Sequence, residues 1–513
     1  MLKQNKIITH LKEWLPLYLI FIFASFLRLH LLLLRDTFWF DEMFSVHFAN
    51  LPWADAIKYW TLETNPPLYT LFLRGWTSIV GINNELLIRL PSTILGLATI
   101  VLLYYFTYKI INKKAAIISS LTLTLSGVHI FINSEARVYS LMIFLTLLSY
   151  FLFYQIFFNG KNKLSVWLIY FFINLLLIYS HLTALSIFVT QFLSLFLLNV
   201  EKKEFRYWFF GHVLIGASWL IWFVPSLLSK LNQNSLSAWY FRPVTTAYAN
   251  VLTLLVSIFM NEDLTPFVFT TFGIILIGAI VFTILKTKNE TDLKQKRLLI
   301  FLQLWAFLLI FSGSIIGVFV TKFYVISSLP LYIILGYSVS RAVKNTKIFY
   351  AIIIFIILLI TPGAYTVSNS GIFSWTKLIN YIETNETKNS FTIITPFNEV
   401  LPLQKYYHGQ RPIVGIYLRE DNFSLEERIV RYNWNQQITD KPELTKWLEQ
   451  YLKTADKIFY IQYTDNFDWM HQIFVEHGWT LEHKQRANGY VDLYLFEFHA
   501  PNYSTTSTIS TKK

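Results

Sequence analysis

The residues from Trp14 to Leu34 read WLPLYLIFIFASFLRLHLLLL, and the stretch RDTFWFDE follows directly, from Arg35 to Glu42. The first stretch is long enough to cross a bilayer as a helix, which takes about 20 predominantly apolar residues. It is too long for a cleaved signal peptide and no run of small residues follows it, so we interpret it as a retained span. The second stretch places two adjacent carboxylates, Asp41 and Glu42, at the mouth of the membrane. There they must be hydrated, paired or used for chemistry.

Apolar runs recur along the chain to about residue 366. Of the 513 residues, 54% are hydrophobic, 18% are aromatic and only 14% are charged, and the mean hydropathy is +0.44. A soluble core does not need this pattern, whereas bilayer-spanning helices do. The sequence therefore predicts a polytopic α-helical membrane protein with about eleven spans. We expect them at residues 15–34, 88–110, 115–132, 138–158, 164–180, 182–199, 207–228, 264–286, 298–319, 323–341 and 347–366.

The formal net charge of +12 suggests a nucleic-acid partner until the positions of the basic residues are considered. They lie in every second connection between the expected spans, as the positive-inside rule requires of cytoplasmic loops. The charge therefore indicates topology and contact with anionic lipids, and no nucleic acid. It predicts a cytoplasmic N-terminus and an extracytoplasmic position for everything after about residue 366. With no cysteine, disulfides, thiolate nucleophiles and cysteine-ligated metals are excluded.

Two long connections are expected on the outer side. The first, 35–87, contains Asp41 and Glu42 and an apolar stretch, 66–80, which is too short for a span and is interpreted as a helix on the outer surface. The second, 230–263, contains Trp239-Tyr240-Phe241-Arg242-Pro243 and is typical of a re-entrant or substrate-covering loop.

The composition changes after residue 366, where short strand-like and helical patterns alternate. This pattern predicts a small extracytoplasmic α/β domain over 367–502, followed by a disordered tail at 503–513. The expected strands are 391–394, 457–461 and 491–496, and the expected helices are 374–385, 399–407, 443–453 and 467–477.

The first candidate for chemistry is the pair Asp41 and Glu42. A carboxylate near apolar surface binds a proton more tightly and can act as a general base toward a hydroxyl group. Alternatively, Asp41 caps a helix that runs from Glu42 toward Asn50. The two roles are compatible.

The second candidate is the segment Glu135-Ala136-Arg137-Val138-Tyr139, between two expected spans. The planar fork of Arg137 is suited to binding a phosphate or carboxylate. The alternative is an ion pair between Glu135 and Arg137 at the interface, with Tyr139 as an aromatic anchor.

For each of three further groups, a purely structural role is an alternative to a functional one. Asn65-Pro66-Pro67 is typical of an ordinary helix start, with Asn65 as N-cap and Pro66 at the first helical position. Lys322 and Tyr324 offer a second cation and a phenol, although a lysine at a helix end can simply extend to the interface. His181 can act as a hydrogen-bond donor or ligand, or be satisfied locally. No grouping has metal-ligand spacing and there is no nucleotide-phosphate loop.

Together, these features favour a lipid-linked, already activated donor that arrives from the bilayer. The cations would hold the phosphate as a leaving group while a base deprotonates the acceptor.

The same residues resemble motifs of the GT-C glycosyltransferases, in particular the bacterial relatives of the protein O-mannosyltransferases and the lipid A aminoarabinose transferases. Order and spacing over 35–145 are more specific than any single motif. The resembling segments are Asp41-Glu42, Asn65-Pro66-Pro67-Leu68-Tyr69, Arg89-Leu90-Pro91-Ser92, Glu135-Ala136-Arg137-Val138-Tyr139-Ser140-Leu141, Ser180-His181-Leu182-Thr183 and Lys322-Phe323-Tyr324 with Leu329-Pro330.

The resemblance implies that Asp41 is the catalytic base and that Glu42 supports it. It implies a donor phosphate site and a substrate pocket, and no cofactor is indicated, with a divalent metal left open. This chain has Asn65 where the aminoarabinose branch has lysine, and Lys322 where the family has arginine. The implied phosphate-site residues are Arg137, Tyr139, Lys322 and Tyr324, and the implied pocket residues are Asn65, Pro66, Arg89, Glu135 and His181.

The resulting hypothesis is a glycosyltransferase on the outer face of the bacterial cytoplasmic membrane. It would transfer a sugar, with inversion, from a polyprenyl-phosphate donor to a hydroxyl group of a protein, lipid or cell-wall glycan. One alternative is a transporter or flippase of lipid-linked sugars, which predicts broken spans with polar residues near the middle of the bilayer. Another is a membrane-anchored sensor whose outer domain binds the ligand.

Overall fold

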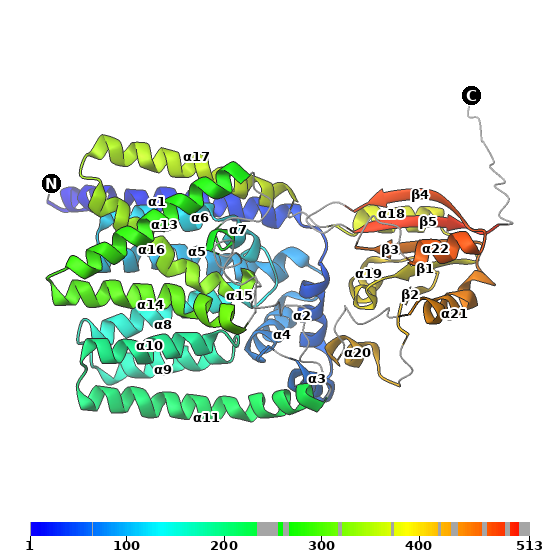
Figure 1. Cartoon of the computed structure of the whole chain (residues 1–513), viewed down its shortest axis with the longest axis horizontal. Helices are drawn as coiled ribbons and strands as arrows, with labels where there is room; N and C mark the ends of the chain where they lie inside the picture. Colours follow the sequence, from blue (N-terminus) through cyan, green and yellow to red (C-terminus); the bar gives the residue numbers. More distant parts are fainter. Residues whose placement is uncertain are drawn as a thin grey trace. The chain divides into compact units, whose positions relative to one another are not determined.

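The computed structural model describes residues 2–63, 65–232, 255–259, 266–316, 321–370, 374–418, 422–431, 440–463, 469–487 and 493–501. The predicted motif 239–243 and the predicted tail 503–513 lie outside these residues. The chain divides into two compact units. Residues 1–34 and 45–371 form the helical unit, and residues 35–44 and 372–513 form the sheet unit (Figure 1).

The helical unit contains a helix in each segment where a span is expected. Eight described helical stretches are long and apolar enough to cross a membrane, which agrees with the predicted polytopic membrane fold. The helices of this unit are α1 (Leu2–Leu34), α3 (Trp53–Leu62), α4 (Leu68–Val80), α5 (Glu85–Ile110), α6 (Lys113–Leu125), α7 (Gly127–Ile132), α8 (Tyr139–Phe157), α9 (Leu164–Ile178), α10 (Ala184–Leu198), α11 (Lys202–Asn232), α13 (Pro266–Asn289), α14 (Leu293–Ile316), α15 (Thr321–Tyr324), η2 (Val325–Ser327), α16 (Ser328–Ala342) and α17 (Thr346–Ser370).

The predicted single span at 115–132 is wrong, because two helices occupy it. Ser126 separates α6 from α7 with an extended backbone (ψ 115°), and its hydroxyl donates to the carbonyl of Phe259 at 2.7 Å. Gly127 begins α7 in close contact with α17, since a Cβ placed on it would lie 3.1 Å from the carbonyl oxygen of Gly363. The break thus places a short helix beside α17. The predicted spans at 164–180 and 182–199 are α9 and α10, which are apolar but only 15 residues long each.

Small residues allow α6 and α16 to pack closely. A Cβ on Gly336 of α16 would lie 2.5 Å from both the carbonyl oxygen of Ala115 and Oγ of Ser119. The same Ser119 hydroxyl donates to the carbonyl of Tyr332 at 2.9 Å. Close backbone approach at small residues and hydrogen bonds between helices are the usual means of association inside a bilayer, where burial of apolar surface drives little.

The sheet unit is built on a five-stranded mixed sheet in the order β2-β1-β3-β5-β4. Strand β1 pairs in parallel with β2 and β3, while β5 pairs antiparallel with β3 and β4. The strands are β1 (Ser390–Ile394), β2 (Ile413–Gly415), β3 (Lys457–Gln462), β4 (Thr480–Arg486) and β5 (Tyr494–His499). The helices are α18 (Thr376–Asn385), η3 (Phe397–Glu399), α19 (Val400–Tyr406), α20 (Leu425–Arg431), α21 (Lys441–Leu452) and α22 (Trp469–Glu476).

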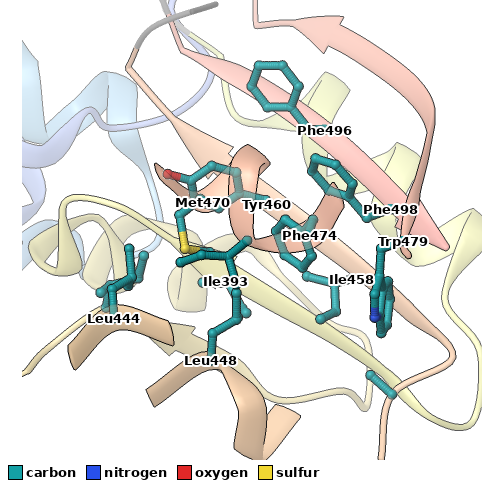
Figure 2. Close-up of a cluster of buried hydrophobic side chains, with 13 residues drawn as sticks. Ile393, Leu444, Leu448, Ile458, Tyr460, Met470, Phe474, Trp479, Phe496 and Phe498 are labelled. Carbon is teal, nitrogen blue, oxygen red and sulfur yellow. The ribbon is translucent and has the colours of Figure 1, made fainter. Parts of the chain in front are cut away.

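Alternating residues of the central strands pack in two separate hydrophobic cores, one on each face of the sheet. Phe459 and Ile461 of β3 pack in a cluster with α18 and α19. Ile458 and Tyr460 pack in the other cluster with α21 and α22, which Figure 2 shows. Helices therefore cover both faces, as predicted for an α/β domain. The predicted strands 391–394 and 457–461 and all four predicted helices are present, while β2, β4 and α20 were not predicted.

Candidate functional site

The segment 35–44 contains the carboxylates Asp41 and Glu42. Hydrogen bonds at the beginning of this segment attach it to the rest of the sheet unit. The carboxylate of Asp36 accepts from the hydroxyls of Ser374 at 2.8 Å and Thr376 at 2.7 Å. The backbone N–H of Trp375 donates to Oγ1 of Thr37 at 3.0 Å. These residues come just before or at the start of α18, so this helix and the segment are fixed to each other.

The middle of the same segment packs on the sheet unit. The N–H of Phe38 donates to the Tyr406 hydroxyl at 2.7 Å. Trp39 packs against the hydrophobic cluster that β3 shares with α18 and α19. The C-terminal domain therefore supports the segment directly.

Glu42 forms a buried ion pair with Arg35. Nη2 of Arg35 lies 3.1 Å from Oε2 of Glu42, and the two side chains are 1% and 0% exposed. Such a pair needs both partners, because a single charge left behind at this depth is poorly compensated. Glu42 thus closes the segment 35–42 into a loop beside Asp41.

Asp41 lies in the first turn of α2 (Phe40–Asn50), so the predicted role as N-cap of a helix starting at Glu42 is wrong. A carboxylate in the first turn is still favourable, because it faces the positive end of the helix dipole. Within the sheet unit, Asp41 interacts electrostatically with Glu399 and Tyr463. Both of these residues were absent from the sequence prediction.

The helical unit brings Glu135, Arg137 and Lys322 into contacts of their own. Nζ of Lys322 lies 3.5 Å from Oε1 of Glu135, whose side chain is fully buried. Nη1 of Arg137 donates to Oγ of Ser45 at 2.9 Å. Lys322 points toward protein groups, since its ammonium also lies 5.2 Å from the ring centre of Phe131. The described contacts of Lys322 are thus with Glu135 and neighbouring aromatic rings.

Aromatic rings lie next to this charged group. The ammonium of Lys322 is 5.7 Å from the ring centre of Tyr139, and the Tyr139 and His181 rings are 6.0 Å apart. The His181 ring is 5.2 Å from that of Phe323, and its Nδ1 lies 3.0 Å from the hydroxyl of Thr183. The interpretation of His181 as locally hydrogen-bonded is thus correct. Glu135, Tyr139, His181 and Lys322 gather in one part of the helical unit.

Tyr324 is buried beside Gly313 of α14. A Cβ on Gly313 would lie only 1.8 Å from the Tyr324 hydroxyl oxygen, so glycine is the residue that leaves room for the phenol. Tyr324 is 1% exposed. In the described residues, the side chain of Tyr324 packs against α14 at Gly313.

Asn65 and Pro66 differ from their prediction. Helix α4 begins at Leu68, and its N-cap is Pro67, without a side-chain hydrogen bond. The Nδ2 of Asn65 donates to Oε1 of Glu63 at 3.1 Å instead. The helix expected at 66–80 is present as α4. Arg89 is fully buried in α5.

Arg28, which lies inside the first apolar stretch, was not predicted to matter. It is fully buried, and its Nε donates to Oδ1 of Asn133 at 2.8 Å. Its Nη1 donates to the carbonyl of Thr124 at 3.2 Å. Asn133 in turn donates to the hydroxyl of Ser140 at 3.0 Å. Arg28 therefore fixes the chain on both sides of Glu135 and Arg137.

We expect Gly96→Ala to destabilise the protein by about 1–3 kcal/mol through overpacking. A Cβ at this position would lie 2.2 Å from the side chain of Asn133, which Arg28 and Ser140 hold in place. Gly278→Ala is the matched control, because nothing lies within 4 Å of a Cβ there and alanine is the better helix former. Thermal unfolding in detergent checks both, and equal unfolding temperatures would contradict the prediction.

Within the part of the chain that the structure describes, no three His, Cys, Asp or Glu side chains are grouped so that they could hold a metal ion. Lys322 instead forms an ion pair with Glu135, and Arg137 donates a hydrogen bond to Ser45. The arrangement in each unit is thus one of carboxylates, cations and aromatic rings.

The comparisons with known proteins agree with the resemblance found in the sequence. Residues 64–229 match the family described as dolichyl-phosphate-mannose-protein mannosyltransferase. No curated protein matches the chain in sequence.

Solved structures share the fold over most of the chain. ArnT from Cupriavidus metallidurans in the apo state has a TM-score of 0.55 at 12% identity, covering 98% of this chain and 99% of that one. The ArnT structure bound to undecaprenyl phosphate has a TM-score of 0.51 at 11% identity, covering 93% and 97%. The oligosaccharyltransferase AglB from Archaeoglobus fulgidus, in complex with an inhibitory peptide and a dolichol-phosphate, has a TM-score of 0.52 at 11% identity, covering 88% and 70%. The predicted GT-C fold is therefore confirmed.

Proposed function

We propose that this protein is a glycosyltransferase that takes a sugar from a polyprenyl-phosphate donor and attaches it to a hydroxyl group of an acceptor. The observation that carries the proposal is the match of 64–229 to a mannosyltransferase family, joined to the GT-C fold. The similar ArnT structure is bound to undecaprenyl phosphate and the similar AglB structure to a dolichol-phosphate, which supports a lipid-linked donor. The basic residues support an outer-face reaction in the bacterial cytoplasmic membrane.

In the proposed reaction, Asp41 removes the proton of the acceptor hydroxyl while the hydroxyl oxygen forms a bond to the anomeric carbon of the sugar. The bond from that carbon to the phosphate oxygen breaks, and polyprenyl phosphate leaves with the electron pair. Attack from the side opposite the phosphate inverts the configuration.

Arg137 and Lys322 are proposed to bind the donor phosphate. The guanidinium of Arg137 can donate two parallel hydrogen bonds to phosphate oxygens, and Lys322 adds a second positive charge. Charge grows on the phosphate as it leaves, so cations placed in advance stabilise the transition state. Glu135 would orient Lys322 through the 3.5 Å ion pair.

The alternative, a flippase for lipid-linked sugars, would use the same cations without breaking a bond. To distinguish the transferase from the flippase, purified protein is reconstituted in liposomes with a labelled donor lipid. The acceptor is identified beforehand by mass spectrometry of envelope glycans from cells with and without the protein. Label on the acceptor supports the transferase, whereas label that only crosses the bilayer supports the flippase.

We expect Arg137→Ala to weaken donor binding about 10- to 100-fold, the loss typical of hydrogen bonds to a charged group. Acceptor binding should change much less. Arg137→Lys keeps the charge but loses the planar fork of the guanidinium. Its donor affinity should therefore lie between those of the wild type and Arg137→Ala. Titration of purified protein with polyprenyl phosphate measures the effect, and an unchanged affinity would exclude the phosphate role of Arg137.

A further inference from the structure

Asn133, the residue directly after α7, is held by three helices that are each long enough to span the membrane. It is 3% exposed. Its side-chain oxygen Oδ1 accepts from Nε of Arg28 in α1 at 2.8 Å, and its backbone carbonyl accepts from the hydroxyl of Thr93 in α5 at 2.7 Å. Its Nδ2 donates to Oγ of Ser140 in α8 at 3.0 Å. Asn133 therefore connects α1, α5 and α8 in one hydrogen-bond network.

The chemistry of the partners fixes the orientation of the Asn133 amide. A guanidinium has only donors, so the atom that faces Arg28 must be the oxygen. The Ser140 hydroxyl donates to the carbonyl of Ile132 at 3.2 Å, so its oxygen is left to accept from Nδ2 of Asn133. An asparagine satisfies both partners at once, whereas an ionised aspartate would lack the donor and an alanine would lack both groups.

Arg28 makes this network rigid. Its guanidinium is fully buried, and it also donates to the carbonyls of Leu123 at 3.4 Å and Thr124 at 3.2 Å. Both carbonyls belong to the last turn of α6, and the last four carbonyls of a helix have no partner within it. A buried cation is costly unless its donors are bonded, so Arg28 holds Asn133 and the end of α6 in one fixed arrangement.

The turn between α7 and α8 carries two charged residues of the proposed donor site. It begins with Asn133, and Ser140 lies in the first turn of α8. The hydrogen bond from Asn133 to Ser140 thus joins the two ends of the turn. Between these ends lie Glu135, which pairs with Lys322 at 3.5 Å, and Arg137. The position of Asn133 therefore determines where the turn presents both charged side chains.

We propose that Asn133 is a positioning residue for the donor phosphate site, and that Thr93 and Ser140 act through it. The phosphate role of Arg137 rests on the proposed function, whereas the fixed turn does not. Hydrogen bonds in a poorly solvated network reinforce one another, so the loss of one loosens the others. A guanidinium that meets two phosphate oxygens at once tolerates little displacement. Loosening Asn133 should therefore weaken donor binding while the protein remains folded.

Two buried threonines of α5 provide a matched test. Thr93→Val removes the hydroxyl that bonds Asn133, whereas Thr99→Val removes one that bonds the carbonyl of Leu95 in the same helix at 2.8 Å. Titration of the purified protein with undecaprenyl phosphate should show an affinity about 3- to 10-fold weaker in Thr93→Val, the loss typical of one hydrogen bond. The affinity should be unchanged in Thr99→Val. Thr93→Ser keeps the hydroxyl and should bind as tightly as the wild type.

Hydrogen exchange measured by mass spectrometry tests the turn without a donor. The backbone amides of residues 133–138 should exchange faster in Thr93→Val than in the wild type, and at the wild-type rate in Thr99→Val. Where the wild type binds undecaprenyl phosphate, equal affinities of the two valine variants would overturn the proposal. An affinity lost in Thr93→Val with unchanged exchange of the turn would overturn it as well. Faster exchange in Thr93→Val, together with a wild type that does not bind undecaprenyl phosphate, would instead overturn the proposed function.

Discussion

Asp41→Asn is expected to lower the rate of sugar transfer by about 10²- to 10⁴-fold, the usual contribution of a general base. The amide has nearly the shape of the carboxylate but cannot accept the proton of the acceptor hydroxyl. The affinity for the donor lipid should stay close to that of the wild type, because the residues proposed to bind the phosphate are Arg137 and Lys322. The measurement is single-turnover transfer from purified donor lipid, with donor binding measured on the same protein.

Asp36→Asn is the matched control for this experiment. Asp36 lies in the same segment, but its carboxylate accepts from the hydroxyls of Ser374 and Thr376. An asparagine there keeps one oxygen that accepts, so the expected loss of transfer is small. Near-wild-type turnover in Asp41→Asn would exclude Asp41 as the base. An equal loss in both variants would indicate that the segment had merely become disordered.

Sequence patterns predicted the helical unit well because a membrane helix must satisfy its own backbone and present apolar side chains. That requirement produces a long apolar run in the sequence wherever a helix such as α5 or α8 crosses the membrane. The break at Ser126 has no such signature, since the run continues through it and the break depends on contacts with Phe259 and Gly363. Strand β4 was missed because it is a mainly exposed edge strand of polar residues, TLEHKQR, without apolar alternation.

The candidate site was only partly visible in the sequence. Arg28 could have been found, because an ionisable residue inside a membrane span is a functional candidate by default. Glu399 could not, since one glutamate in a domain of ordinary composition carries no signal until folding buries it. The helix start at 65–67 was misplaced because Asn-Pro-Pro fits an N-cap locally, while Asn65 hydrogen-bonds Glu63 instead.

We expect Glu42→Gln to destabilise the protein by about 3–5 kcal/mol, because it removes the carboxylate that forms an ion pair with the buried Arg35 cation. Arg35 and Glu42 are 1% and 0% exposed, so water cannot replace the lost carboxylate. Thermal unfolding in detergent measures the loss. Glu443→Gln, in the first turn of α21, is the control: its side chain is exposed, and most exposed substitutions change stability by less than 0.5 kcal/mol.

The double variant Arg35→Met/Glu42→Leu separates the structural role of Glu42 from a chemical one. Replacing a buried ion pair by apolar side chains of similar size is often neutral, so much of the stability lost in Glu42→Gln should return. Transfer should return with it, because the charge of Glu42 is directed at Arg35 and holds the segment that carries Asp41. A double variant that is stable but inactive would show that Glu42 acts on the base or the substrate directly. The supporting role of Glu42 would then be chemical, and the loop closed by the ion pair would be incidental to it.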